Sequence, residues 1–389
     1  MSQLTQSLSQ YWNKIQGSLF SWLEEELDAL TKKQQQLIYI LELVRIEEFL
    51  PDCFGCVGRP QKTRAAIARS YIAKMVYNMD TTVLLIDRLK TDKNLRRICG
   101  WERATQIPSE STFSRAFDEF AQTKLPQEAH KVLIESTLAD EVILHVSRDS
   151  TAIETREKPQ TKRENQKSEE EKELTIDKPK KRGRPHKDEQ RPARELSRIE
   201  KQKTMSLDEM LQDLPTACDK GAKKDSKGNT MYWTGVKLHL DTIDGGIPVS
   251  AIVTSASVHD SQVAIPLTLM TVERIVSCYD LMDAAYDAPA IAEYSRSVGH
   301  VPLIDKNPRG DQQLKNEMEA ENLARKTLNL KMPEDLRYNE RTTAERANSR
   351  MKDDFGACKV RVRGHSKVAC HLCFGVLVLA ADQLMKLFG

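Results

Sequence analysis

The stretch RYNERTTAERANSRMKDDFG, residues Arg337–Gly356, decides how the rest of the chain is organised. It has no proline, and its only glycine is its last residue, so most of its residues are compatible with a helix. On a helix, at about 100° per residue, an apolar stripe forms on one sector and a polar row on another. The stripe, which we expect to be buried, is Ala344, Ala347, Met351 and Phe355, and the polar row is Tyr338, Arg341, Glu345 and Lys352.

The polar row has two interpretations. Arg341 and Glu345 are four residues apart and could form an ordinary ion pair on a solvated helix face, which helix chemistry alone favours. The other interpretation is a functional face, because the row presents a phenol, two cations and one carboxylate side by side. The rest of the chain has to decide between them.

The composition is that of a globular protein with some solvated linker. The chain has 389 residues, enough for two or three domains, of which 39% are hydrophobic and 30% charged. The formal net charge is only +2, so any nucleic-acid surface must be local. Residues Met1–Gln16 lack an apolar signal region, and the most apolar run, Val368–Ala381, is short for a membrane span. We therefore expect a cytoplasmic protein with no membrane partner and a buried helix over Val368–Ala381.

Cysteine usage leaves a weak metal hypothesis open. Without a secretory signal, the eight cysteines are expected to be reduced. Two C-x-x-C pairs, Cys53 with Cys56 and Cys370 with Cys373, could together form a tetrahedral zinc site. The second pair falls in the apolar helix, where cysteine is common as a core residue, and we favour that interpretation.

The first part of the chain predicts an all-α domain over residues 1–138. Helical periodicity runs from Trp12 to about Leu50 and continues over Thr63–Asn78, Thr81–Ile98 and Pro108–Phe120. In the last of these, Phe113, Phe117 and Phe120 recur at helical spacing and should be core residues. Ser114 and Arg115 on the same helix could contact DNA, as the second helix of a helix-turn-helix does, or the helix could be a plain bundle element.

From Glu141 the pattern changes to strands. Val142–Asp149 predicts a strand that ends on an acid, although an Asp-Ser pair after a strand, taken alone, is more often a turn or a helix cap. Thr230–Asp241 alternates in polarity, and Ile247–Ser255 follows it across a turn at Asp244-Gly245-Gly246. Ser277–Met282 predicts a short strand ending at Asp283, and open α/β sheets place ligands at such strand ends.

Between the first two strands lies a highly charged insertion, at about residues 154–228. Its Lys, Glu and Arg-rich composition predicts a disordered segment, because it cannot bury enough apolar surface to order itself. Within it, Lys180–Pro185 is a short basic arm similar to an AT-hook. Arg182 and Arg184 could enter an A·T-rich minor groove or neutralise DNA phosphates, or they could belong to a solvated linker, which we slightly favour.

Three motifs resemble those of one family. The spacing of Tyr338, Arg341, Glu345 and Lys352 resembles the Y-R-E-K signature of DDE transposases from bacterial insertion sequences. The phrase from Asp283 to Asp287 resembles that family's D-x-[GA]-[YF]-D motif, and IPSESTFSRAF, residues 107–117, is similar to a segment ahead of its catalytic domain. The resemblance covers about Thr63 to Phe388, interrupted by the charged insertion.

The resemblance implies an α/β fold with an RNase H-like catalytic core and a mixed sheet over residues 139–389, preceded by the all-α domain. It implies that Asp149, Asp283 and Glu345 are the catalytic carboxylates and hold two Mg²⁺ ions, for which Mn²⁺ could substitute. Asp260, in His259-Asp260-Ser261, is our second choice for the middle carboxylate. By the same resemblance, Tyr338, Arg341 and Lys352 would contact DNA.

The expected function is a transposase that cleaves DNA strands at the ends of an insertion sequence and transfers them into target DNA. Its partners would be the terminal inverted repeats, the target DNA and a second copy of the chain, because two ends must be joined. Two alternatives are a stand-alone metal-dependent nuclease and a domesticated transposase-derived DNA-binding protein without catalysis. Short inverted repeats flanking the gene would favour the transposase.

Overall fold

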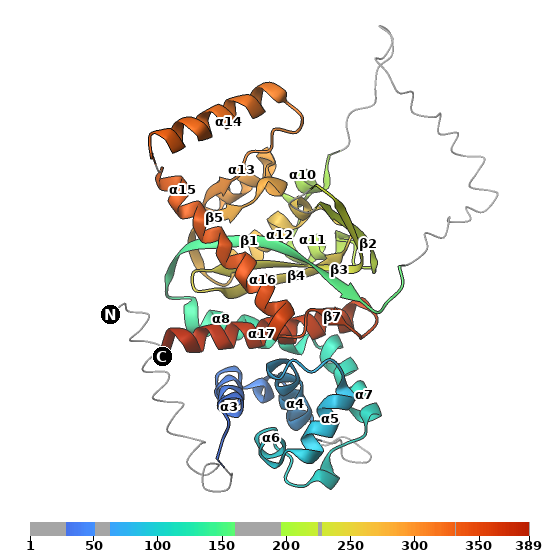
Figure 1. Ribbon diagram of the computed structural model, residues 1–389. Helices are drawn as coiled ribbons and strands as arrows, with labels where there is room; N and C mark the ends of the chain where they lie inside the picture. Colours follow the sequence, from blue (N-terminus) through green and yellow to red (C-terminus); the bar gives the residue numbers. More distant parts are fainter. Residues whose placement is uncertain (1–28, 51–62, 160–195, 225–227, 331, 389) are drawn as a thin grey trace, which may run out of the picture.

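The computed structural model describes residues 29–50, 63–159, 196–224, 228–330 and 332–388 (Figure 1). The predictions for Arg182, Arg184, Cys53 and Cys56 concern residues outside these ranges.

One mixed sheet of seven strands forms the centre of the catalytic part. Its strands are β1 (Val142–Thr155), β2 (Asp219–Lys224), β3 (Thr230–Ile243), β4 (Ile247–Ser255), β5 (Val276–Met282), β6 (Val301–Ile304) and β7 (Lys359–Val360). β3 is antiparallel to β1 and β4, whereas β5 is parallel to β1 and β6. The order β4-β3-β1-β5-β6 with these directions is that of an RNase H-like core, as predicted.

The β3–β4 hairpin follows the predicted pattern closely. Val236, Leu238 and Leu240 are buried on one face of β3. The strand ends at Ile243, two residues later than predicted. Gly245 and Gly246 have φ angles of 83° and 79°, which L side chains rarely adopt, so the tight turn requires glycine there. The alternation and the turn together determine which face of the hairpin is buried.

Helices cover both faces of the sheet. On one face lie α16 (Thr342–Asp354) and α17 (His365–Phe388), and on the other lie α12 (Ala264–Val272), α13 (Pro289–Ser297) and the short α10 (Arg198–Gln202) and α11 (Leu207–Asp213) (Figure 1). Two further helices, α14 (Gln312–Thr327) and α15 (Pro333–Tyr338), bury no residue, and α14 projects beyond the sheet.

The predicted disorder of residues 154–228 is wrong for part of that range. β1 continues to Thr155, and residues 196–224 contain α10, α11 and β2. Few apolar residues are needed to order them, because they pack on the sheet and its helices. Leu214, for example, packs in one cluster with Ile252 of β4 and Leu267 of α12. A composition averaged over the whole charged stretch conceals such short elements.

The N-terminal part is helical, as predicted. Its helices are α3 (Lys32–Val44), α4 (Arg64–Val76), α5 (Thr82–Thr91), α6 (Lys93–Ile98), α7 (Glu110–Gln122) and α8 (Leu125–Leu138). Phe113, Phe117 and Phe120 of α7 are buried, and their rings lie 6.0, 4.8 and 6.3 Å from that of Tyr71 in α4. This aromatic cluster forms the centre of the N-terminal core.

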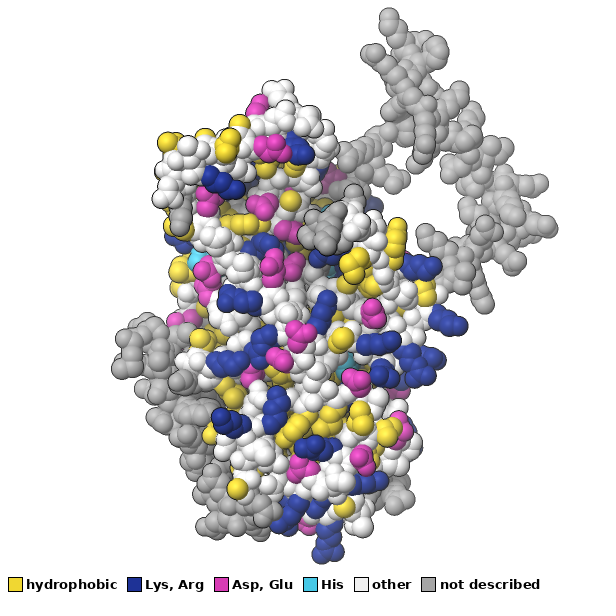
Figure 2. Space-filling model, viewed as in Figure 1, with side chains coloured by type: hydrophobic (Ala, Val, Ile, Leu, Met, Phe, Trp, Pro, Cys, Tyr) yellow, Lys and Arg dark blue, Asp and Glu magenta, His cyan; other side chains and the backbone are white. Residues whose placement is uncertain are grey.

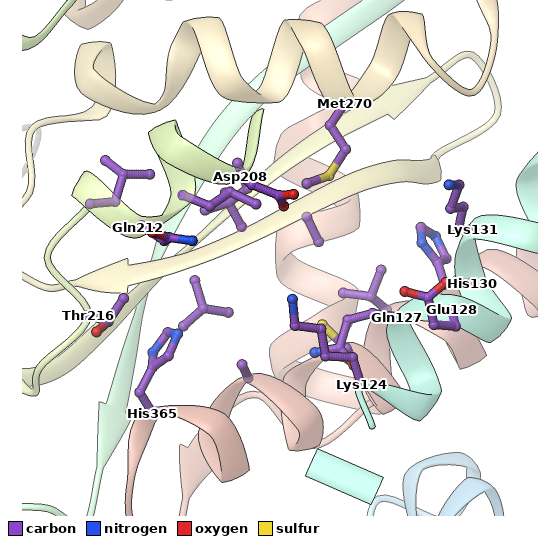
Figure 3. A pocket seen from close by; sticks show the side chains of 18 of the residues that line it. Lys124, Gln127, Glu128, His130, Lys131, Asp208, Gln212, Thr216, Met270 and His365 are labelled. Atoms are coloured by element: carbon purple, nitrogen blue, oxygen red, sulfur yellow. The ribbon is translucent and has the colours of Figure 1, made fainter. Parts of the chain in front are cut away.

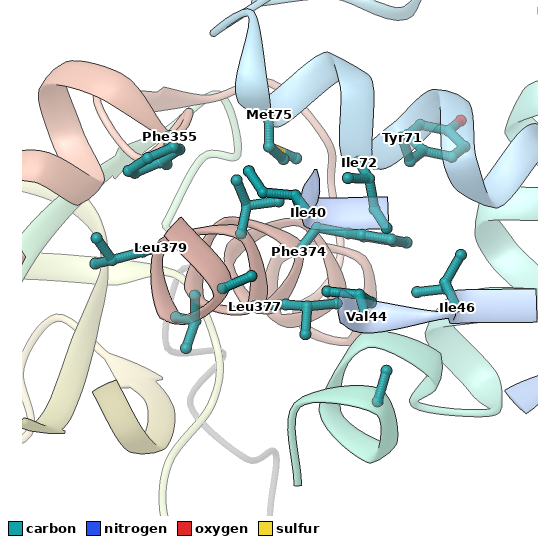
Figure 4. Packing of buried hydrophobic residues seen from close by; sticks show 14 of the residues in the cluster. Ile40, Val44, Ile46, Tyr71, Ile72, Met75, Phe355, Phe374, Leu377 and Leu379 are labelled. Atoms are coloured by element: carbon teal, nitrogen blue, oxygen red, sulfur yellow. The ribbon is translucent and has the colours of Figure 1, made fainter. Parts of the chain in front are cut away.

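Helix α17 joins this core to the sheet. The ring of Phe374 lies 5.8 Å from Tyr71 and 6.3 Å from Phe117, and Figure 4 shows it facing side chains of α3 and α4. His365–Leu387 is long and apolar enough to span a membrane, but 83% of its apolar window is buried inside the protein. Val368–Ala381 therefore lies within a buried helix, as predicted. The proposed division at residues 138/139 stays a prediction, because helices on its two sides share one hydrophobic cluster.

Candidate active site

Two neighbouring parallel strands bring Asp149 and Asp283 side by side. In the register between β1 and β5, Ser147 lies opposite Leu281, so Asp149 is level with Asp283 two residues further on. Adjacent strands are about 4.8 Å apart, which suits two carboxylates that share ligands. Asp149 does not end its strand as predicted, because β1 remains paired with β3 and then β7 up to Thr155.

Asp149 is mostly buried, and a helix residue holds one of its oxygens. Burial raises the pKa of Asp149, the nearby charge of Asp283 raises it further, and hydrogen bonds from Ser150 and Asn348 work in the opposite direction. Asn348 Nδ2 donates to Asp149 Oδ2 at 3.0 Å, whereas its amide oxygen is buried and has no partner in the described part of the chain. One oxygen of Asp149 is thus fixed from α16.

Asp283 begins a single 3₁₀ turn, η4 (Ala284–Tyr286). Its Oδ1 accepts from the backbone N–H of Ala285 at 2.9 Å, which fixes the carboxylate at the end of β5. Burial raises the pKa of Asp283, and the charge of Asp260 adds to that effect. Tyr286, at the end of the turn, is fully buried, and its hydroxyl has no partner among the described residues.

The helix predicted over Arg337–Gly356 is interrupted. It consists of α15, a 3₁₀ turn η5 (Asn339–Arg341) and α16. Thr342 Oγ1 donates to the carbonyl of Asn339 at 3.0 Å and Thr343 Oγ1 to that of Glu340 at 2.5 Å. These hydroxyls compete for carbonyls that an α-helix would use, which favours the tighter turn at this point.

The buried stripe of α16 is confirmed and rests on α17. Ala344, Ala347, Met351 and Phe355 are all at most 2% exposed. A Cβ on Gly375 of α17 would lie only 2.6 Å from the carbonyl oxygen of Phe355. This glycine therefore allows the close approach of α17 that determines where the end of α16 lies.

Glu345 is not grouped with the two aspartates in this structure. Its carboxylate pairs with Arg341 Nη2 at 2.6 Å and its side chain is 52% exposed, as the solvated interpretation of the polar row expects. Among the described residues, no group of three or more His, Cys, Asp or Glu side chains could hold a metal ion. The predicted carboxylate triad is thus not assembled in this conformation.

Asp149 and Asp283 nevertheless fit a divalent metal ion such as Mg²⁺. Such ions take oxygen ligands and commonly use one or two carboxylates together with substrate phosphate. Both carboxyl groups have a raised pKa because they are buried near other negative charge, and a cation between them would relieve that penalty.

The remaining residues of the polar row, Tyr338, Arg341 and Lys352, lie around the two aspartates. Tyr338 donates to Asp305 at 2.7 Å, and the Arg341 guanidinium lies 5.7 Å from the Tyr338 ring. Arg341 and Lys352 both interact electrostatically with Asp149. Burial and the nearby charge of Lys223 lower the pKa of Lys352. The cations of the row thus flank the aspartates.

Asp260, our second choice for the middle carboxylate, is already neutralised. Lys237 Nζ lies 2.9 Å from its Oδ1, and His239 Nδ1 lies 3.9 Å away. Burial works to raise the pKa of Asp260, but His239 and Lys237 more than offset it, so the pKa is lower than usual. A carboxylate with its own ammonium partner is a poorer metal ligand than Asp283, which supports the first choice.

Three residues near the aspartates were missed by the sequence analysis. They are Asn348, which donates a hydrogen bond to Asp149, Tyr286, which interacts electrostatically with both aspartates, and Lys223 of β2, whose charge partly opposes the rise in the pKa of both. Tyr286 belongs to the quoted D-x-[GA]-[YF]-D motif, so that motif could have indicated it. Lys223 lay in the stretch that we predicted to be disordered, and nothing in its local sequence distinguishes it.

Ser114, one of the predicted DNA contacts, lines a cavity of about 480 Å³ between α4, α5, α7 and the segment after β7. Arg156, Arg361 and Arg363 line the same cavity. Arg115 instead donates to the carbonyl of Ser111 on its own helix. Lys74 and Lys367 also line the cavity, as do the carboxylates Asp80, which pairs with Arg361 at 3.1 Å, and Glu110, so cations outnumber carboxylates there by five to two.

The zinc hypothesis gains no support from the described half of its ligands. Cys370 and Cys373 are buried in α17, and burial raises the pKa of both thiols. Buried neutral thiols are core residues.

A second cavity, of about 510 Å³, lies at the outer edge of β4 between α8, α11, α12 and α17 (Figure 3). His130, Arg274 and His365 line it, but no predicted site residue does. We therefore assign the chemistry to the aspartates and not to this cavity.

Comparison with known families gives the class of protein. A family model described as a transposase DDE domain matches residues 142–380, more than half of the chain, and a second one, described as a transposase domain, matches residues 23–119. Searches of curated proteins and of solved structures found no match. The protein is thus a DNA-acting enzyme of the nucleotidyl-transfer type. The chain belongs to the transposases with a DDE domain, which generally depend on a divalent metal ion.

Proposed function

We propose that this transposase cleaves DNA strands at the ends of its insertion sequence and joins the freed 3′ ends to target DNA, in a reaction that depends on a divalent metal. The observation that carries the proposal is the register that sets Asp149 level with Asp283, together with α16 lying against β1. The Y-R-E-K spacing on that segment, with its cations beside the aspartates, supports placing the chain among the insertion-sequence transposases that carry this signature.

Asp149 and Asp283 would hold Mg²⁺, or Mn²⁺ in its place, and Glu345 would become the third carboxylate ligand. When bound, two such ions stabilise the attacking and leaving oxygens of an in-line displacement at phosphorus. Glu345 reaches this role by leaving Arg341, so the ion pair at 2.6 Å would be exchanged for metal and phosphate contacts.

The other residues of the row would handle DNA. Arg341, released from Glu345, grips a phosphate with two N–H groups, and Lys352 supplies a point charge. Tyr338 would stack on an unpaired base near the cut. The basic surroundings of Ser114 support contact between the N-terminal helices and the inverted repeat, and a homodimer would bring two ends together.

The proposal is tested with a duplex that carries the inverted repeat flanking the gene. Glu345→Gln should bind this duplex as the wild type does but lose Mg²⁺-dependent cleavage. Normal cleavage by that variant would refute the catalytic assignment. In a paired test, Asp283→Asn should abolish cleavage, and if only Asp260→Asn does so, Asp260 is the middle carboxylate.

A further inference from the structure

The hairpin of β2 and β3 extends beyond the RNase H-like order of strands. The first half of β3, Thr230–Gly235, pairs with β2, whereas its second half pairs with β4. The extension continues the strand that pairs with the active-site strand, because β3 pairs with β2 over Thr230–Gly235 and with β1, which carries Asp149, over Gly235–Ile243. An appendage in this place can reach whatever DNA the carboxylates hold.

A groove of about 560 Å³ separates the hairpin from the ends of β1 and β7. It is lined by Lys220, Tyr232, Trp233 and Thr234 of the hairpin and by Glu154, Thr155 and Lys359. The Trp233 indole N–H is buried and has no partner among the described residues. A Cβ on Gly221 would collide with the Trp233 ring, so this glycine makes room for the indole at the groove wall.

The cations around the groove are not neutralised. Lys220, Lys223 and Lys359 are exposed, and none forms an ion pair with a carboxylate in the described part of the chain. On α14, by contrast, Arg325 pairs with Glu321 and Asp335. Figure 2 shows Lys and Arg side chains gathering on the right of this face, beside β2 and down towards β7. Exposed lysines that have no carboxylate partner are the usual contacts of DNA phosphates.

The hairpin also presents large apolar side chains to solvent. Tyr232 is 77% exposed and Met231 is 64% exposed, although both lie within a paired strand. A ring exposed to this degree is free to contact a partner. Between lysines, such a ring is suited to stack on the face of an unpaired base.

We propose that the β2–β3 hairpin is an arm that holds the unpaired DNA end next to the cut. Lys220 and Lys359, which line the groove, neutralise its phosphates, and Tyr232, on the same face of the hairpin as Lys220, stacks on one of its bases. This inference rests on the proposed function, because only strand cleavage generates such an end at the site. It assigns a DNA contact to a part of the chain outside the Y-R-E-K row.

The test uses a duplex of the inverted repeat that ends in a short single-stranded extension, with 2-aminopurine at its first unpaired position. Tyr232→Ala should lose the fluorescence quenching caused by stacking and bind about 5- to 150-fold more weakly, whereas Tyr232→Phe should keep both. Lys220→Gln/Lys359→Gln should make the plot of log K against log salt shallower by about 1.4–1.8, for two lost phosphate contacts. Lys315→Gln/Lys326→Gln, on the projecting helix α14, removes the same charge away from the arm and is the matched control.

The outcomes separate the arm from the function itself. If the wild type neither binds nor cleaves the duplex, the proposed function fails. If the wild type does both, but the arm variants keep the salt dependence of the α14 control and Tyr232→Ala keeps its quenching, the arm proposal alone is wrong. Circular dichroism melts that match the wild type exclude misfolding as the cause of a loss.

Discussion

The ion pair beneath Asp149 makes the sharpest prediction about stability. Arg148 and Asp241 are 1% and 0% exposed, and the guanidinium makes two hydrogen bonds of 2.7 Å to the carboxylate. Thr271 Oγ1 adds a third hydrogen bond to Asp241 at 2.8 Å. In Arg148→Met, a carboxylate remains buried with only that hydroxyl, and the free energy of unfolding should fall by about 3–5 kcal/mol.

The double variant Arg148→Met/Asp241→Leu removes both charges and fills similar volume. Its free energy of unfolding should return to within about 1 kcal/mol of the wild type, so the two sites should show a coupling energy of at least about 2 kcal/mol. Urea titrations followed by tryptophan fluorescence and circular dichroism measure both values, provided that the m-value is unchanged. A double variant as unstable as Arg148→Met would refute the reasoning, since the loss would then come from packing and not from an uncompensated charge.

Three further predictions concern other parts of the fold. Gly375→Ala should destabilise the protein by about 1–3 kcal/mol in urea, because its Cβ meets a carbonyl at the end of α16, whereas Ser366→Ala on the same helix should be neutral within about 0.5 kcal/mol. His130 and His371 are buried, and burial lowers the pKa of each to about 3. Their folded pKa is below the unfolded value, so stability should fall as pH drops below about 6.5, by about 2 kcal/mol each between pH 7 and 5, and a His371→Gln variant should show a shallower dependence. Asn348→Ala should raise the Mg²⁺ concentration at half-maximal cleavage by about 10- to 100-fold, and an unchanged midpoint would show that the carboxylate it contacts is held in place without it.

Much of the sheet could be predicted because local patterns decide it. Alternation in β3 and the two turn glycines specify the β3–β4 hairpin, and the last residue before Asp283 is where β5 ends. The buried stripe of α16 follows from helical spacing in the same way. Each of these features depends on residues that are neighbours in the sequence.

The site could be predicted less fully because it depends on approach between distant elements. Asn348 resembles any polar helix residue until α16 lies on β1, and only then does it become a partner of Asp149. Glu345 was expected beside the aspartates, but its conformation depends on the competing charge of Arg341. Lys223 needed β2, whose pairing with β3 is not visible in the composition of its surroundings.

The position of α17 has a consequence for how the protein is made. The inner faces of α3, α4 and α7 pack on this helix, which is synthesised after every other element described. Until α17 leaves the ribosome, those helices cannot bury the surface that orders them, and their closing contacts span hundreds of residues of sequence. The N-terminal helices and α16, which carries Glu345 and Asn348, therefore reach their packed positions together and only at the end of synthesis.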